Sequence, residues 1–154
     1  MKTMIVYVSV SHNNTEKVAR VIADNLPAEM EKVDQIDANS LATYDLLGFG
    51  SGIYNKKHDK SLIALVESLP QSNKKAFIFS TAGYVTEGRV RKYHEPLRNA
   101  LLAKGYNVIG EFNCQGLDTA GLGRIRALNK GRPNEEDLKK AADFAKSLRE
   151  KMAV

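Results

Sequence analysis

The sequence contains very little cysteine and no long apolar run. Cys114 is the single cysteine among 154 residues, which excludes an internal disulfide framework and is typical of a protein in a reducing cytosol. No apolar run approaches the length that spans a bilayer. The first strand-like run begins at Met4, without the basic region, apolar core and cleavage site of a secretory signal. We therefore expect a cytoplasmic protein that does not associate with membranes.

The sequence also lacks internal repeats, low-complexity segments and any known nucleic-acid-binding motif. Its 23 Lys and Arg residues against 18 Asp and Glu give a formal net charge of +5, which would suit a nucleic-acid partner. The basic residues are spread along the chain, however, and the densest runs mix Lys with Glu or Asp, as solvated helix faces do. We therefore expect no nucleic-acid binding.

The composition, 43% apolar and 27% charged, is that of an ordinary globular protein. A chain of 154 residues can form one packed core but is too short for two, so we expect one domain, 1–154. Apolar runs typical of strands lie at about 3–9, 30–36, 46–50, 75–80 and 106–114. Amphipathic periods typical of helices lie at about 14–26, 60–69, 88–104 and 133–152. This alternation predicts an α/β fold, a doubly wound five-stranded parallel sheet with helices on both faces.

Three details of this pattern bear on the fold. Pro96 lies inside the expected helix at 88–104, so that helix either begins near the proline or bends there. Residues 115–132 are irregular and rich in glycine, and a loop of this length is usually functional or mobile. The last helix has the clearest signals, because Pro133 and Asn134 precede an acidic first turn.

A loop rich in hydroxyls and amides, 9–15, separates the first expected strand from the first expected helix. Free backbone N–H groups and the positive end of the helix dipole form an anion site at such a helix start. The hydroxyls of Ser9, Ser11 and Thr15 can donate to phosphate oxygens, and the loop contains no Lys. This set suits a phosphate monoester better than a nucleoside triphosphate with its Mg²⁺. An equally simple interpretation is that Asn13 or Asn14 caps the helix and the serines form a turn.

Two further loops follow the expected strands at 46–50 and 75–80. In 50–55, two glycines permit close backbone approach and Tyr54 offers an aromatic face. In 80–84, small residues precede Tyr84. The carboxyl ends of parallel strands meet at one edge of a sheet, where α/β proteins bind ligands. Each loop alone could be an ordinary turn, but together they suit a planar aromatic cofactor with a phosphate tail.

The stretch 9–19 resembles the FMN-phosphate loop of flavodoxins, which is rich in Ser and Thr and usually ends Gly-Asn-Thr. The resemblance continues in matching order over nearly the whole chain, through 50–54, 79–83, 105–114 and 130–138. It implies a flavodoxin-like fold with strand order 2-1-3-4-5 and non-covalently bound FMN. It assigns the phosphate side of the cofactor to the first loop, at Ser9, Ser11, His12, Asn13, Asn14 and Thr15. It assigns the two sides of the isoalloxazine ring to Gly52, Ile53 and Tyr54 and to Thr81, Ala82, Gly83 and Tyr84.

The chain departs from the family pattern in two ways. Asn13 stands where Gly is usual, and if this position needs a positive φ, we expect weakened rather than abolished phosphate binding. Well-studied flavodoxins are acidic, whereas this chain carries a net charge of +5. Basic residues and histidines follow the second and third loops: Lys56, Lys57, His58, Lys60, Arg89, Arg91, Lys92 and His94. They either cover the solvent side of two helices or bring positive charge to the flavin, which would make it a milder reductant.

The resemblance implies FMN-dependent electron transfer, in which the flavin does the chemistry and the protein orients it. We identify no catalytic residue and no metal ligands, and we expect acidic redox proteins as partners. Two alternatives remain open, an NAD(P)H- or quinone-type flavin reductase or oxidase on the same fold, and a flavin-free binding module. The sequence does not favour a phosphorylated receiver domain, since Ser9 and Gly50 stand where it needs acidic residues. Cys114 is more simply a packing residue than a redox group.

Overall fold

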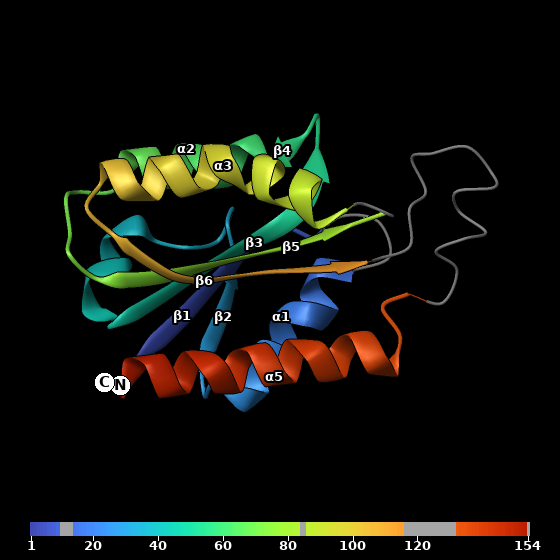
Figure 1. Ribbon diagram of the computed structural model, residues 1–154. Coiled ribbons are helices and arrows are strands. Elements are labelled where there is room, and N and C mark those ends of the chain that lie inside the picture. The colour runs from blue at the N-terminus through green and yellow to red at the C-terminus, as the bar shows by residue number, and fades with distance from the viewer. Residues whose placement is uncertain (10–13, 84–85, 116–131, 154) are drawn as a thin grey trace.

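The computed structural model of the protein describes residues 1–9, 14–83, 86–115 and 132–153. The strands are β1 (Thr3–Tyr7), β2 (Glu29–Lys32), β3 (Leu46–Tyr54), β4 (Lys57–His58), β5 (Lys75–Ala82) and β6 (Asn107–Gln115). The helices are α1 (Asn14–Asn25), the short 3₁₀ helix η1 (Ala38–Thr43), α2 (Lys60–Ser68), α3 (Glu87–Ala103) and α5 (Glu135–Met152). Figure 1 shows a central sheet between two helical layers, with α2 and α3 on one face and α1 and α5 on the other.

Five of the strands are parallel and lie in the order β2-β1-β3-β5-β6. Counted among the parallel strands alone, this is the expected order 2-1-3-4-5, and the flavodoxin-like α/β fold is confirmed. The sixth strand, β4, pairs antiparallel with the end of β3. A two-residue strand carries no periodicity, so the sequence pattern does not predict β4. The strand expected at 30–36 is also shorter than predicted, since β2 covers four residues at the sheet edge.

Alternate residues of the central strands enter two separate cores, one on each face of the sheet. Val6, Phe49 and Ile78 are fully buried in the core under α2 and α3. Ile5 and Phe77 are fully buried in the core under α1 and α5. Each such side chain contributes on the order of 1.5–3 kcal/mol through removal of apolar surface from water. The two cores hold the sheet flat against both helical layers and fix where its carboxyl edge lies.

The repeated glycines of β3 serve this packing. A Cβ atom at Gly48 would lie 2.1 Å from the ring of Phe77, and one at Gly50 would lie 2.2 Å from the ring of Phe79. The two rings, with centroids 6.3 Å apart, therefore cross β3 where it has no side chains. The close backbone approach that the two glycines of 50–55 permit is therefore made, at Gly50, by the ring of Phe79 from the neighbouring strand.

Two helices settle points that the sequence left open. α3 begins at Glu87 and continues through Pro96, so it does not begin near the proline. α5 begins with the predicted signals, since Asn134 and Asp137 form a capping box in which each side chain accepts from the other residue's backbone N–H. Within the described part of the chain, no helix combines the length and the apolar character needed to cross a membrane.

Candidate functional site

The carboxyl ends of β1, β3 and β5 lie at the same edge of the sheet. Tyr7 at the end of β1 is in register with Gly50, and Gly52 is in register with Thr81. The backbone N–H of Val8 continues this pairing by donating to the carbonyl of Gly50 at 3.0 Å. The described parts of the three loops that sequence analysis singled out are thus brought together. Ser11, His12, Asn13 and Tyr84 lie outside the described residues.

The first loop meets the third through a pair of threonines. The hydroxyl oxygens of Thr15 and Thr81 lie 2.7 Å apart, and both residues are buried. Ser9 accepts a hydrogen bond of 3.2 Å from the backbone N–H of Glu16, in the first turn of α1. Ser9 therefore accepts from a backbone N–H group of the first turn of α1, a role that the simpler interpretation of this loop gave to Asn13 or Asn14.

An unforeseen contact orients the first turn of α1. The hydroxyl of Tyr7 donates to the carboxylate of Glu16 at 2.8 Å. Burial and this hydrogen bond raise the pKa of Tyr7 to about 12, so the phenol stays protonated and continues to donate. This hydrogen bond therefore joins the end of β1 to the residue that follows the loop 9–15.

The second loop is a hairpin. Asn55 and Lys56 have φ values of 51° and 64°, and they join β3 to β4 as a tight turn. Ile53 is half-buried and Tyr54 is 38% exposed, while a Cβ at Gly52 would lie 2.6 Å from the Tyr54 hydroxyl. The phenol of Tyr54 thus lies over the backbone of Gly52, which needs the absence of a side chain there.

The hairpin is fastened to the start of α2. The hydroxyl of Ser51 donates to the carbonyl of Gly52 at 2.6 Å and accepts from the backbone N–H of Asp59 at 3.0 Å. The Asp59 carboxylate in turn accepts from the backbone N–H of Ser61 and caps the helix. The third loop follows β5 directly, and Ala82 and Gly83 are half-buried there.

Beneath these loops lie two histidines whose burial sequence analysis did not anticipate. His58 of β4 is 0% exposed and His94 of α3 is 1% exposed, with ring centroids 4.8 Å apart. Of the two interpretations of these basic segments, the one in which they cover the solvent side of two helices is therefore wrong for both histidines. Burial and the neighbouring His94 lower the pKa of His58 to about 3. His58 is therefore neutral near pH 7 and adds no positive charge to the loops.

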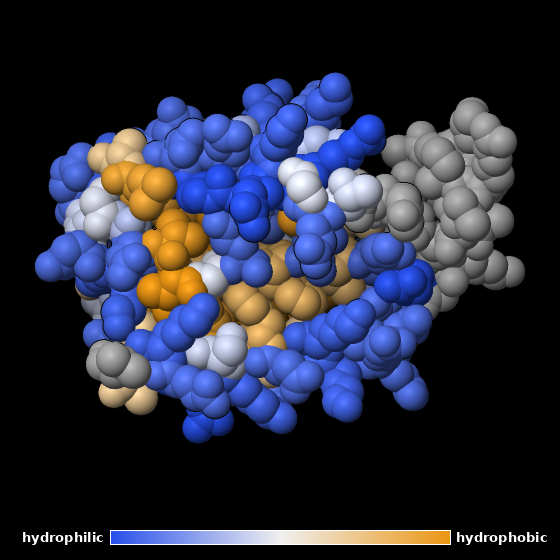
Figure 2. All heavy atoms as spheres, viewed as in Figure 1, coloured by the Kyte–Doolittle hydropathy of each residue, from blue (hydrophilic) through white to orange (hydrophobic). Residues whose placement is uncertain are grey.

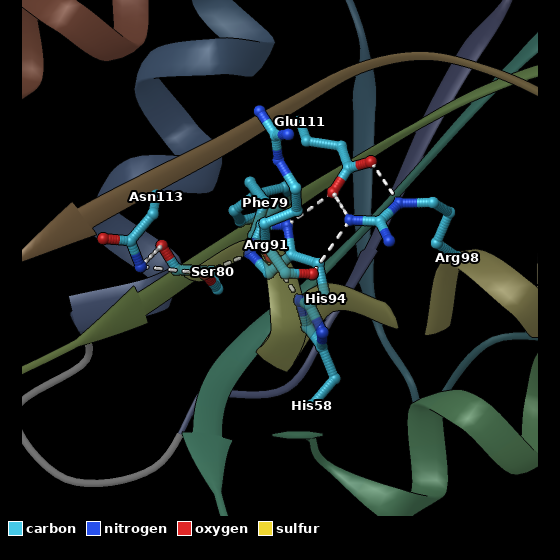
Figure 3. Close-up of polar contacts among 8 residues, drawn as sticks. All are labelled: His58, Phe79, Ser80, Arg91, His94, Arg98, Glu111 and Asn113. Atoms are coloured by element: carbon cyan, nitrogen blue, oxygen red, sulfur yellow. Dashed lines mark hydrogen bonds and ion pairs between the residues drawn. The ribbon is translucent and has the colours of Figure 1, made fainter. Parts of the chain in front are cut away.

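Figure 3 shows the polar network around these rings. Nδ1 of His94 lies 2.9 Å from Oε1 of Glu111, and Nε2 of His94 lies 2.6 Å from the hydroxyl of Ser80. Arg98 donates to both carboxylate oxygens of Glu111, at 2.6 and 2.8 Å. Burial disfavours the charge on Glu111, but the hydrogen bonds from Arg98 and His94 outweigh it and lower the pKa of Glu111 to about 2.

The ionised carboxylate of Glu111 determines which group donates in its hydrogen bonds. An ionised Glu111 can only accept, so Nδ1 of His94 donates to it. Nε2 of His94 shares a hydrogen bond with the hydroxyl of Ser80, and Nδ2 of Asn113 donates to the same hydroxyl oxygen at 2.9 Å. Nε2 of His58 donates to the carbonyl of Phe79 at 3.0 Å. The network therefore converges on Glu111, whose carboxylate accepts from His94 on its inner side and from Arg98 nearer the surface.

A cavity of about 830 Å³ lies beside this network, between α3 and β6. Its wall includes His94, Arg98 and Glu111, and Lys140 of α5 lies on its far side. In Figure 2, apolar residues gather along the middle of the face that carries β6, between the hydrophilic surfaces of α3 and α5. The cavity follows the middle of β6 and is separate from the loops at the carboxyl edge.

Cys114 is a packing residue in this structure. It is 3% exposed, and burial together with the negative charge of Asp137 raises the pKa of its thiol to about 12. A thiol in this environment stays protonated near neutral pH and is a poor nucleophile. In the described residues, no three His, Cys, Asp or Glu side chains gather in a way that could hold a metal ion.

Comparison with known proteins gives one consistent picture. A family model described as a flavodoxin domain matches residues 4–125. An uncharacterized protein of Methanocaldococcus jannaschii is 46% identical over 149 residues, which cover 96% of this chain and 98% of that protein. The flavodoxin-like domain-containing protein BilS of Clostridioides difficile is 26% identical over 147 residues, which cover 90% of this chain and 80% of BilS. The crystal structure of oxidised flavodoxin 2 from Bacillus cereus has a TM-score of 0.73 at 21% identity, covers 98% of this chain and 99% of that chain, and shares the fold.

Proposed function

We propose that this protein, which belongs to the flavodoxin domain family, binds FMN and carries electrons with it. Family membership gives the fold and the place where a ligand is expected. The choice of FMN as the ligand and of electron transfer as the task is our inference from the residues at the carboxyl edge of the sheet.

The contact between Thr15 and Thr81 is the observation that carries this proposal. It joins the start of α1, where backbone N–H groups and the helix dipole favour an anion, to the loop after β5. A flavin mononucleotide needs phosphate donors within reach of a surface that accepts a planar ring. The contact between the two threonines keeps the start of α1, which offers phosphate donors, next to the loop after β5, which we propose to face the ring.

The described residues fit such a cofactor. The hydroxyls of Ser9 and Thr15 at the start of α1 are suitable phosphate donors. Ile53, Tyr54 and Ala82 leave apolar and aromatic surface partly exposed at the same edge. Ser11, His12, Asn13, Asn14, Gly52, Gly83 and Tyr84 complete the proposed set.

Bound FMN would supply the one- and two-electron chemistry, and the chain would supply binding, orientation and electrostatics. The first loop would hold the phosphate, while the hairpin around Tyr54 and the loop after Thr81 would enclose the ring and exclude water from part of it. The excess of positive charge would favour acidic redox proteins as partners in the cytosol.

The experiment is a titration of flavin-free protein into FMN, followed by quenching of flavin fluorescence, with riboflavin as the ligand that lacks the phosphate. We expect FMN to bind much more tightly than riboflavin. Ser9→Ala should weaken FMN binding and leave riboflavin binding unchanged. Ser68→Ala, an exposed serine on α2, is the matched control and should change neither. Absence of FMN binding by the unmodified protein would refute the proposal.

A second measurement separates a carrier from a reductase. The FMN-loaded protein is mixed with NADH or NADPH under anaerobic conditions, and the flavin absorbance is followed. A carrier should show no rapid bleaching without an added partner reductase. Rapid bleaching by the nicotinamide alone would favour the reductase alternative.

A further inference from the structure

The carboxyl end of β5 is anchored to both helical layers by two consecutive residues. Side chains of consecutive strand residues point to opposite faces of a sheet. Accordingly, the hydroxyl of Thr81 meets Thr15 on the α1 side, and the hydroxyl of Ser80 meets Nε2 of His94 on the α3 side. Ala82 and Gly83, which the proposed function places beside the flavin ring, follow at once.

The anchor on the α3 side is a fixed chain of charged and polar groups. Arg98 donates to both oxygens of Glu111, Glu111 holds the plane of the His94 ring through Nδ1, and Nε2 of the ring holds the hydroxyl of Ser80. Asn113 donates to the same serine from β6, so Ser80 is held from two sides. Figure 3 shows these side chains converging between α3 and the two strands. A ring oriented by a carboxylate in this way has little freedom to rotate.

The same ring also contacts the other loop. His58, packed against His94, belongs to β4 and is in register with Ile53 of the hairpin. Its Nε2 donates to the carbonyl of Phe79, the residue before Ser80. His94 therefore touches, directly or through His58, the segments on both sides of the proposed ring site.

We propose that His94 is a positioning residue of the FMN site, which holds the β3–β4 hairpin and the loop after β5 at the spacing that the isoalloxazine ring requires. The inference rests on the proposed function and adds a residue that the resemblance to flavodoxins did not assign. His94 would act through Ser80 and His58 and would not touch the phosphate. Removal of the His94 imidazole should therefore weaken the binding of FMN and of riboflavin by the same factor.

Two substitutions of His94 each keep one of the two hydrogen bonds of its ring and remove the other. His94→Asn places an amide near the position of Nδ1 and can keep the contact with Glu111, but it loses Ser80. His94→Gln places an amide near the position of Nε2 and can keep Ser80, but it loses Glu111. Ser80→Ala removes the hydroxyl with little change in volume and serves as an independent variant. Lys92→Ala, an exposed position on α3, is the control.

We expect His94→Asn and Ser80→Ala to weaken FMN and riboflavin equally, by roughly tenfold, since one buried hydrogen bond is lost. His94→Gln should stay within about threefold of the unmodified protein, and Lys92→Ala should match it. In flavin-free protein, hydrogen exchange of the amides of Ile53, Ala82 and Gly83 should accelerate in His94→Asn and remain slow in His94→Gln.

Each adverse result has one meaning. Unchanged flavin affinities and amide exchange in His94→Asn and Ser80→Ala would overturn the role of His94 while leaving FMN binding intact. Equal losses in the Asn and Gln variants would show that the ring only fills space, which also overturns it. Failure of the unmodified protein to bind FMN would instead refute the proposed function. Even then, unchanged amide exchange in flavin-free His94→Asn would show that His94 does not hold the two loops.

Discussion

The hydroxyl oxygens of Thr15 and Thr81 lie 2.7 Å apart, although 66 positions separate the two residues in the chain. This contact joins the first turn of α1 to the carboxyl end of β5, and both residues are buried. It holds together the two halves of the proposed cofactor site before any ligand binds, which reduces the ordering that a ligand must bring about.

Removal of one hydroxyl of this pair should destabilise the protein. Thr81→Val leaves the buried hydroxyl of Thr15 without this partner, which costs about 1–2 kcal/mol of unfolding free energy. The double variant with Thr15→Val should lose less than the sum of the single variants, because the two residues share one interaction. Urea denaturation measures all three.

Thr3→Val is the matched control for this series. Thr3 is 2% exposed, and its hydroxyl has no hydrogen-bond partner among the residues that the structure describes. Its removal should be neutral or stabilising. An equal loss at Thr3 and Thr81 would show that the pair contributes nothing specific.

Gly50→Ala should destabilise the fold by about 1–3 kcal/mol, because the added methyl would meet the Phe79 ring inside a packed core. Gly88→Ala is the opposite case, since nothing lies within 4 Å of its added methyl on α3. That helical substitution should stabilise by about 0.5–1 kcal/mol. Chemical denaturation compares the two, and similar effects at both positions would contradict the packing argument.

Acidification should destabilise the protein in two overlapping ranges. The pKa of His58 falls from 6.5 to about 3, mainly through burial, so between these values the unfolded chain binds a proton that the folded chain does not. Stability is therefore lost as the pH falls from about 6.5 towards 3. Burial opposes the charge of Glu111, but Arg98 and His94 lower the pKa of its carboxyl from 4.5 to about 2. The stability that the ionised Glu111 contributes is therefore lost as the pH falls from about 4.5 to 2.

Urea midpoints measured from neutral pH to about pH 3 test this prediction. His58→Gln keeps a donor for the Phe79 carbonyl but cannot be protonated, so its stability should depend less on pH between about 6.5 and 4.5. The stability of Glu111→Gln should depend less on pH than that of the unmodified protein only below about pH 4.5. A His58→Gln variant with the pH dependence of the unmodified protein would show that His58 is not the group that titrates.

Exposed lysines of the hairpin should make bound flavin easier to reduce. Lys56 lies in the β3–β4 turn and Lys57 begins β4 in register with Tyr54, and positive charge there favours the negatively charged reduced flavin. Replacement of both by Gln should move the reduction potential to more negative values, and added salt should diminish the difference. Reductive titration with a reference dye measures this, with Lys146→Gln on α5 as the control. A very negative potential in the unmodified protein would contradict the effect of charge.

Some parts of the site had signals in the sequence and others had none. The apolar run before Ser9 and the helical period after Thr15 placed the first loop between a strand and a helix, as the structure does. The burial of His58 and His94 had no such signal, because both follow segments rich in Lys or Arg. Only the packing of α3 and β4 against β5 brings in the partners, Ser80 and the Phe79 carbonyl, that make a buried imidazole favourable.

The sequence by itself determined the order of helices and strands, the parallel sheet and the start of α5 at Asn134, because these follow from periodicity and capping within short segments. Tertiary structure alone decided that Gly50 makes room for Phe79, that Thr15 meets Thr81, and that the rings of His58 and His94 pack together and bond to β5. Each of these contacts depends on groups far apart in the chain, and their free energy arises only when folding removes both partners from water.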